Sequence, residues 1–251
     1  SAGAGPGGPL RVAVISDLNG RYGSTRYAAS VHAAVDRLVE AEPDLVLSTG
    51  DMVAGQRRGL DHEAMWDAFH AAVTDRLAAA GIPLAVTPGN HDASGYRAFA
   101  AERALFVREW AGRRPEVRFV DDRDYPLRYS FVAGPALFVS LDATTVGPLS
   151  GEQRRWLDGQ LAAAPRRVKI VFGHVPLHPF AVGRERQTLA DPALERLLVE
   201  RGVALFISGH HHAYYPGRRG PLRVVSTACV GAGPRPLIGS RERSERSLVF
   251  F

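Results

Sequence analysis

Residues 203–212 read VALFISGHHH, an apolar run that ends abruptly on one glycine and three histidines. An unbroken run of Val, Leu, Phe and Ile is typical of a strand that is buried on both faces of a sheet. Four earlier segments repeat this arrangement, with an apolar run followed closely by Asp, Asn or His. In chain order the five polar groups are Asp17-Leu18-Asn19, Gly50-Asp51, Gly89-Asn90-His91-Asp92, Gly173-His174 and Gly209-His210-His211-His212.

The first three apolar runs, residues 10–16, 45–49 and 82–87, are separated by segments with helical periodicity. Apolar side chains recur every three to four positions in residues 27–41 and 61–80, which predicts two helices. Strands that alternate with helices in this way form parallel sheets. The first third of the chain is therefore predicted to be α/β.

The rest of the chain predicts a second sheet. Gly134-Pro135 separates two apolar runs and predicts a hairpin there. The remaining elements are expected as strands at 128–132, 136–141, 168–172, 203–208, 222–228 and 248–251, and as helices at 151–163 and 189–201. Residues 1–9 are rich in Gly, Ala and Pro and predict a flexible linker. We expect one domain over residues 10–251, because no internal repeat divides it.

The polar groups predict a metal site because of where they lie in the sheet. The carboxyl ends of parallel strands meet at one edge, where α/β proteins bind their ligands. Carboxylate, amide and imidazole groups at that edge are ligands of divalent metals. A glycine precedes four of the five groups of ligands and lets the backbone turn and approach the site closely. Asp51 is the natural bridging carboxylate of a two-metal hydrolytic site.

Composition narrows the class of protein and of partner. The chain has 251 residues, 45% hydrophobic and 23% charged, as soluble globular proteins have. Its single Cys229 cannot form an internal disulfide, and no apolar run approaches the roughly 18 residues of a membrane span. The net charge of +5 indicates either attraction to anionic phosphate esters or a coding bias toward arginine. Nucleic acid is not favoured as a partner, because the paired arginines are scattered without interleaved aromatic residues.

Taken together, the five polar groups resemble the motifs of calcineurin-like metallophosphoesterases. The order in that family is Asp-x-His, Gly-Asp, Gly-Asn-His-Asp or Glu, Gly-His and Gly-His-x-His. The segment from Leu141-Asp142 through Gln153, Trp156 and Leu157 also resembles the family's sequence before the fourth motif. This resemblance spans residues 11–228. It implies an α/β fold, a four-layer α/β/β/α sandwich with two central mixed sheets.

The resemblance also implies which residues bind two divalent metal ions. One ion would be bound by Asp17, Asn19 and His212. The other ion would be bound by Asn90, His174 and His210. The carboxylate of Asp51 would bridge the two ions. Manganese is the first choice for these ions, with iron, zinc and magnesium as alternatives.

Catalytic roles follow from the same resemblance. A metal-bridging hydroxide would attack phosphorus. His91 would protonate the leaving-group oxygen or stabilise the transition state, and Asp92 would orient His91. The expected activity is metal-dependent hydrolysis of phosphomonoesters, phosphodiesters or both, with a small phosphate ester as the substrate.

One position departs from the family pattern. The first motif ends in Asn19, where the family usually has His, and an amide oxygen is the weaker donor to a borderline-soft metal. Three interpretations stay open: Asn19 binds the metal and favours Mn or Mg, it lies behind a water ligand, or the position binds little metal. Purple acid phosphatases, a related branch, also lack this His but have a Tyr three residues after the Gly-Asp pair. Ala54 occupies that position here, so the sequence does not support their Tyr–Fe(III) centre.

This departure motivates a rival hypothesis, a catalytically weakened metal-binding or regulatory protein of the same fold. The intact segment from Gly89 to Asp92 argues against it. A nuclease is a third hypothesis, which predicts that binding to DNA or RNA depends steeply on salt. The sequence leaves the substrate and the oligomeric state open. A start without Met favours an exported protein, periplasmic or secreted, over a cytoplasmic one.

Substrate contacts are expected from Arg21 and Arg26, because a guanidinium binds phosphate through two parallel hydrogen bonds. The alternative is that both are ordinary solvated arginines. His178, four residues after His174, is expected either to reach the substrate or the second metal's surroundings, or to lie at the surface between two prolines. His211 is expected to form local hydrogen bonds rather than to coordinate a metal.

Overall fold

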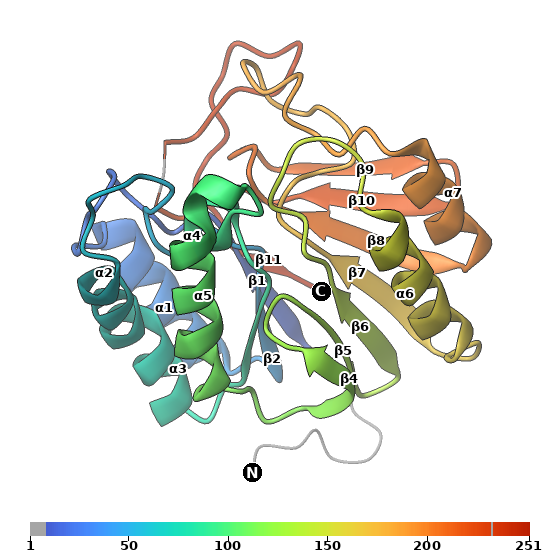
Figure 1. Cartoon of the computed structure of the whole chain (residues 1–251), viewed down its shortest axis with the longest axis horizontal. Coiled ribbons are helices and arrows are strands. Elements are labelled where there is room, and N and C mark those ends of the chain that lie inside the picture. The colour runs from blue at the N-terminus through green and yellow to red at the C-terminus, as the bar shows by residue number, and fades with distance from the viewer. Residues whose placement is uncertain (1–8, 232) are drawn as a thin grey trace.

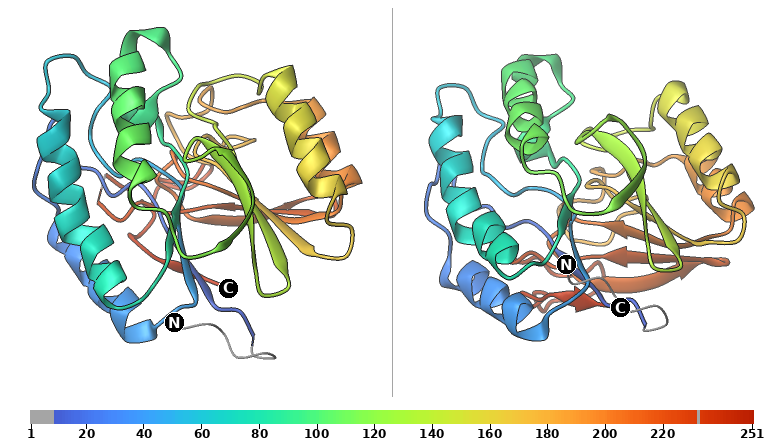
Figure 2. Two further views of the ribbon diagram at one scale, coloured as in Figure 1. Left: turned by 60° about the horizontal axis from the view of Figure 1, so that its bottom comes forward. Right: turned by 90° about the horizontal axis from the view of Figure 1, so that it is seen from below.

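The computed structural model of the chain describes residues 9–231 and 233–251, so the linker predicted at 1–9 lies, except for Pro9, outside the described residues. Two β-sheets pack face to face, and helices cover the outer face of each sheet (Figure 1, Figure 2). These four layers, helix, sheet, sheet and helix, confirm the fold that the motifs predict. The expectation of a single domain over residues 10–251 stays a prediction.

The first sheet contains the strands predicted for the first third of the chain. Its order is β11-β1-β2-β3, with β1 at Val12–Ile15, β2 at Leu45–Ser48, β3 at Leu84–Val86 and β11 at Val249–Phe250. Strands β1, β2 and β3 are parallel to one another, as predicted, and β11 is antiparallel to β1. Ile15, Ser48 and Val86 are in register, so the chain leaves all three strands at the same edge.

The second sheet is longer and also mixed. Its order is β4-β5-β6-β7-β8-β10-β9, at Arg118–Asp124, Arg128–Ala133, Ala136–Ser140, Val168–Phe172, Val203–Ser208, Leu222–Ser226 and Tyr215–Arg219. The four strands from β6 to β10 are parallel, while β4, β5 and β9 run antiparallel to their neighbours. Phe172 and Ile207 are in register at the ends of β7 and β8, and polar motifs follow both strands.

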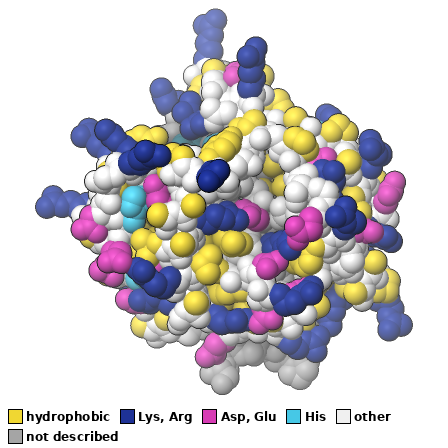
Figure 3. All heavy atoms as spheres, in the orientation of Figure 1, with side chains coloured by type: hydrophobic (Ala, Val, Ile, Leu, Met, Phe, Trp, Pro, Cys, Tyr) yellow, Lys and Arg dark blue, Asp and Glu magenta, His cyan; other side chains and the backbone are white. Residues whose placement is uncertain are grey.

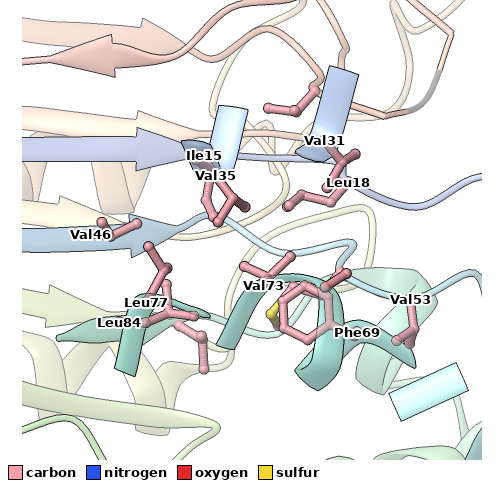
Figure 4. Packing of buried hydrophobic residues seen from close by; sticks show 14 of the residues in the cluster. Ile15, Leu18, Val31, Val35, Val46, Val53, Phe69, Val73, Leu77 and Leu84 are labelled. Atoms are coloured by element: carbon pink, nitrogen blue, oxygen red, sulfur yellow. The ribbon is translucent and has the colours of Figure 1, made fainter. Parts of the chain in front are cut away.

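Helices on the outer face of the first sheet enclose one core. They are α1 at Ala29–Ala41, α2 at His62–Phe69, a π-helical turn at His70–Thr74, α3 at Asp75–Ala79 and α5 at Ala100–Ala111. Figure 4 shows Val35 of α1 beside Ile15 of β1 and Val31 of α1 beside Leu18, with Phe69 of α2 and Val73 of the π-helical turn nearby in the same core. This buried apolar contact fixes the sheet edge from which the first three motifs project.

Two helices, α6 at Gly151–Ala162 and α7 at Pro192–Glu200, cover the second sheet. Ser150 caps α6, because its Oγ accepts a hydrogen bond from the Gln153 N–H at 3.1 Å. Asp191 caps α7 in the same way, accepting from the Leu194 N–H at 2.9 Å. Tyr129 and Phe131 are among the aromatic side chains between the two sheets.

The elements that were not predicted are α4 at Asn90–Ala93, a 3-10 turn at Arg97–Phe99, α5, β4 and β9. α5 buries only Glu102, Phe106 and Trp110, so its sequence lacks a clear apolar stripe. β9 contains Pro216 and Gly217 and pairs only with β10 at the edge of its sheet, where strand propensity is least needed. The helix predicted at 61–80 is broken by its π-helical turn. Within the described chain, no helix is long and apolar enough to span a membrane.

Candidate metal centre

The strand ends bring the predicted ligands together. Each predicted ligand lies just past a strand: Asp17 after β1, Asp51 after β2, Asn90 after β3, His174 after β7, and His210 and His212 after β8. Both sheets therefore contribute to one site. Its ligand atoms form two overlapping groups, Asp51 with His174 and His210, and Asp17 with Asp51 and His212, and within each group they lie within 4.8 Å of one another. Asp51 belongs to both groups, as expected of a bridging ligand.

The backbone at four of these ligands is left-handed, a conformation that costs a non-glycine residue on the order of 1 kcal/mol or more. The φ angles are 50° at Asp17, 55° at Asp51, 68° at His210 and 56° at His212. Strained backbone concentrates at functional sites, where the surrounding structure maintains it. Here it turns consecutive side chains out of the strand direction and toward one point.

Two glycines permit the close approach of the second and third motifs. Gly50 has φ 95°, and a Cβ there would lie 2.7 Å from Gly89 N and 2.9 Å from His174 Nδ1. A Cβ on Gly89 would lie only 2.1 Å from Asp51 N and 2.3 Å from Asp51 Oδ1. A side chain at either position would therefore separate Asp51 from its neighbouring ligands. Gly173 is different, since its nearest contact would be 3.3 Å.

The first metal group consists of Asp51, Asn90, His174 and His210. His174 Nε2 lies 3.3 Å from Asp51 Oδ2, 3.0 Å from Asn90 Oδ1 and 3.2 Å from His210 Nδ1. Three lone-pair-bearing atoms around one nitrogen are the donor set of a divalent transition metal. This convergence supports a metal ion here on the chemistry of the residues themselves.

The outer ring nitrogens of the first metal group are also fixed. His174 Nδ1 is 2.7 Å from the Thr49 carbonyl oxygen, and His210 Nε2 is 3.0 Å from Gln187 Oε1. A proton on each outer nitrogen satisfies these acceptors and leaves the inner nitrogen free to coordinate. Such contacts orient metal-binding histidines and fix their tautomers.

The second metal group consists of Asp17, Asp51 and His212. Asp17 Oδ2 accepts hydrogen bonds from Ser16 Oγ at 2.6 Å and from the His210 N–H at 3.1 Å. Its other oxygen, Oδ1, is buried without a hydrogen bond and lies 3.1 Å from His212 Nε2. An orphaned buried carboxylate oxygen that faces an imidazole nitrogen is well placed for a cation.

In the absence of metal ions, protonated histidine balances the negative charge of the carboxylates at the centre. Burial raises the pKa of Asp51, but His174, His91 and His210 outweigh it and lower the pKa below its usual range. Burial lowers the pKa of His174, but the Asp51 carboxylate outweighs it and raises that pKa to about 9. A proton on His174 thus occupies the place of a cation. Metal binding at such a site releases the proton.

Asn19 lies beside the second metal group, and its expected role as a ligand stays a prediction. Its side chain is buried, and Nδ2 donates to the Val53 carbonyl at 3.3 Å, which leaves Oδ1 as an acceptor. It lines a 230 Å³ cavity together with Asp51, His212 and Ala54. Ala54 offers no ligand atom. The second metal group therefore has neither an imidazole at position 19 nor a phenol at position 54.

The expectation that Asp92 contacts and orients His91 is wrong. The ring of His91 is fixed by a hydrogen bond between Nδ1 and the Gly55 carbonyl at 2.8 Å. Asp92 instead accepts three backbone N–H groups, from Met52 at 2.8 Å, Val53 at 2.9 Å and Gly89 at 2.9 Å. A carboxylate that accepts several backbone donors stabilises a loop. Asp92 therefore positions the loop that carries Asp51.

The expected substrate contacts have different outcomes. Arg21 lines the cavity beside the second metal group. Arg26 is exposed and does not line that cavity. His178 does not face the metals, because its Nε2 lies 3.2 Å from Glu195 Oε2 on α7. His211 forms hydrogen bonds, but not local ones: Nδ1 accepts from the Phe180 N–H at 3.2 Å and Nε2 lies 2.9 Å from the Gln187 carbonyl oxygen, partners 31 and 24 residues away in the sequence.

Several residues at the centre were not predicted. Asn90 Nδ2 donates to Gln56 Oε1 at 2.8 Å, and Gln187 supports His210. The ring of Tyr22 lies 5.3 Å from that of His91, and the Arg57 guanidinium lies 5.7 Å from the Tyr22 ring. Gln56, Arg57 and Gln187 belong to none of the five motifs, whereas Tyr22 follows the first motif and adjoins Arg21. The carbonyl groups that orient the histidines carry no sequence signal at all.

Comparison with known proteins identifies the family. The sequence profile of the calcineurin-like phosphoesterases matches residues 10–214, and the chain belongs to that family. Purple acid phosphatase 15 of Arabidopsis thaliana is 27% identical over 94% of this chain and 46% of its own length. A probable glycerophosphodiester phosphodiesterase, GpdQ of Arcobacter nitrofigilis, is 28% identical over 61% of this chain and 52% of its own length. The chain spans about half the length of the curated relatives it matches.

Solved structures with the same fold include phosphatases. A dimetal phosphatase from Danio rerio superposes with a TM-score of 0.64 at 18% identity, covering 90% of this chain and 89% of its own. The purple acid phosphatase PPD1 from yellow lupin superposes with a TM-score of 0.67 at 16% identity, covering 96% of this chain and 47% of its own. At these identities the likeness shows the fold alone.

Proposed function

We propose that the chain hydrolyses phosphate esters, with two divalent metal ions at the candidate metal centre. The observation that carries this proposal is the pair of overlapping ligand groups that share Asp51. Membership of the calcineurin-like phosphoesterases and relatives named as a phosphatase and a phosphodiesterase support it. The substrate would be a small phosphate ester.

The chain's own residues divide the work of binding the ions. Asn90, His174 and His210 would bind one ion, Asp17, Asn19 and His212 the other, and Asp51 both. When bound, the two ions would supply Lewis acidity and a shared hydroxide as the nucleophile. Manganese fits best, because the second metal group offers mostly oxygen atoms.

His91 is the proposed general acid. Its Nδ1 is engaged by the Gly55 carbonyl, which leaves Nε2 as the nitrogen that can exchange a proton. The residue lines the cavity beside Asp51 and Tyr22. A proton donated from Nε2 would neutralise the leaving-group oxygen, a contribution typical of general acids.

Hydrolysis of 4-nitrophenyl phosphate and bis(4-nitrophenyl) phosphate with added Mn²⁺ tests the proposal. We expect activity that a chelator abolishes and Mn²⁺ restores, and a decrease of about 100-fold or more in His91→Ala. His178→Ala is the matched control, because its ring contacts α7 and should leave activity unchanged. No hydrolysis with any divalent metal, in protein that binds two ions, would contradict the proposal.

A further inference from the structure

Two arginines lie near the metal centre without a counter-charge. Arg184 and Arg235 are half-buried, and the Nε of each is buried without a hydrogen-bond partner. Neither forms an ion pair with a carboxylate in residues 9–231 and 233–251. A Cβ placed on Gly183 would lie 3.5 Å from Arg235 Nη1, so the Arg235 guanidinium packs against the segment that carries Arg184.

The two segments that carry these arginines are paired with each other. Val182 N–H donates to the Pro236 carbonyl at 3.0 Å, and Ile238 N–H donates to the Phe180 carbonyl at 2.8 Å. The Arg235 N–H donates to the carbonyl of the metal ligand His212 at 3.0 Å. Figure 1 shows both loops rising together at the top of the molecule, and Figure 3 shows basic side chains projecting there. The pairing ties both arginines to the second metal group.

Arg184 is also connected to the first metal group. Its guanidinium donates to Gln187 Oε1, the same oxygen that faces His210 Nε2 at 3.0 Å. Burial and the adjacent Arg235 lower the pKa of Arg184, while Asp17 and Asp51 raise it. Both of these carboxylates belong to the metal groups, so their negative charge acts on the Arg184 guanidinium.

The positive charges of Arg184 and Arg235 would be stabilised by a bound anion. Two half-buried guanidinium groups repel each other, and buried charges in proteins are normally paired. Asp17 and Asp51 do not supply the pairing once two divalent ions bind them, because four positive charges exceed two negative ones. The counter-ion of the arginines is then a ligand of the metal centre.

We propose that Arg184, backed by Arg235, binds the terminal oxygens of a dianionic phosphoryl group at the metal centre, so that phosphomonoesters are preferred over phosphodiesters. This inference rests on the proposed function and names its substrate class. A monoester phosphate presents three terminal oxygens and close to two negative charges near neutral pH. A diester presents two such oxygens and one charge, so it gains less from the arginines.

The test compares both substrates in Mn²⁺-loaded protein. In Arg184→Gln we expect kcat/KM for 4-nitrophenyl phosphate to fall about 10- to 100-fold, the loss of one hydrogen bond to a charged group. For bis(4-nitrophenyl) phosphate we expect a fall below about 5-fold, and Arg184→Lys should recover part of the monoester activity. Arg186→Gln, an exposed arginine of the same loop, is the matched control and should match the wild type. Equal losses on both substrates, or no loss on either, would overturn the inference.

Calorimetric titration with inorganic phosphate separates this inference from the proposed function. The Kd for phosphate should rise about 10- to 100-fold in Arg184→Gln, with the metal content unchanged. If the wild type hydrolyses neither ester but phosphate binding still depends on Arg184, the proposed function fails and the anion site stands. If phosphate binds equally to both proteins, the anion site is wrong whatever the activity.

Discussion

The two metal groups share Asp51 but differ in the ligands around it. The first has two imidazoles, His174 and His210, and an outer hydrogen bond fixes each ring. The second has one imidazole, that of His212, whose Nδ1 contacts the Gly233 carbonyl at 3.0 Å. Its side chain is 12% exposed, whereas that of His174 is fully buried. The same fold thus builds one nitrogen-rich, enclosed group and one oxygen-rich, more open group.

The difference comes from two positions in the sequence. Asn19 replaces the imidazole that the family usually has, and Ala54 lies where purple acid phosphatases have their Tyr. Both residues line the cavity at the second metal group. The ion of the second metal group should therefore be bound more weakly, and it should be the harder ion of the two.

The largest expected difference is between the metal contents of the His174→Ala and His212→Ala variants. We expect His174→Ala to lose both ions on dialysis, because Nε2 contacts three other residues of the centre. Several kcal/mol of transition-state stabilisation go with the ions, so kcat/KM should fall about 1,000-fold. His212→Ala should lose only the ion of the second metal group. Metal content by mass spectrometry and nitrophenyl phosphate hydrolysis check both, and His212→Ala losing both ions while His174→Ala keeps one would reverse the comparison.

Restoring the imidazole at position 19 should reduce the difference between the groups. We expect Asn19→His to tighten Zn²⁺ binding at the second metal group by about 10-fold or more, because imidazole suits zinc better than an amide oxygen. Asn19→Ala should weaken Mn²⁺ binding there if Asn19 is a direct ligand. Competition titrations measure both affinities. Unchanged Mn²⁺ affinity in Asn19→Ala would instead favour a water ligand at that position. Activity that appears only in Asn19→His would support the rival, a weakened binding or regulatory protein.

Removing Gln187 should weaken the first metal group alone. The amide accepts from His210 Nε2, and loss of such an outer contact typically costs 10- to 100-fold in metal affinity. We expect about a 10-fold rise in the Kd of the tighter ion in Gln187→Ala, with the weaker ion unaffected. Titration without substrate isolates this effect. Glu185→Gln, an exposed neighbour, serves as the control.

The smallest expected effect is on the pH dependence of stability and comes from His70, a histidine outside the metal centre. Burial lowers the pKa of His70 to about 4, below the roughly 6.5 of an exposed histidine. The unfolded chain therefore binds the proton first, and stability should fall as the pH drops from about 6.5 toward 4. In chelator-treated protein, the loss of Tm between pH 7.5 and 5 should be smaller in His70→Leu than in the wild type. His32→Gln, at an exposed position, should change nothing; an equal loss in all three proteins would contradict this assignment.

The ligand set could be predicted because each ligand directly follows a strand. Strand ends in a parallel sheet meet at one edge, so strand order accounts for the meeting of Asp17 and Asp51. His174 follows a strand of the second sheet, and the face-to-face packing of the two sheets brings it to them. The contact partners of those ligands could not be predicted. Asp92 and His91 are adjacent in the sequence, yet their side chains bind different parts of the backbone. A loop conformation decides that difference, and no periodicity encodes it.

The loops and the exposed elements were also beyond the sequence pattern. Arg184 contacts Gln187, the partner of His210, from a loop that pairs with the segment at Arg235, about fifty residues later. The spacing of His178 after His174 left open whether it reaches the site or lies at the surface, and its contact with Glu195 on α7 decides for a place away from the metal groups. α5 presents too few buried side chains to show a helical stripe. Long-range pairing and local turns, not composition, decided these positions.

Stepwise titration of metal-free protein with Mn²⁺, followed by electron paramagnetic resonance, tests the inequality of the two metal groups most directly. We expect two binding steps, with the weaker step absent in His212→Ala and altered in Asn19→His. The tighter step should persist in both variants. Two ions that bind with equal affinity in a single step, unaffected by either substitution, would contradict the distinction between the two metal groups.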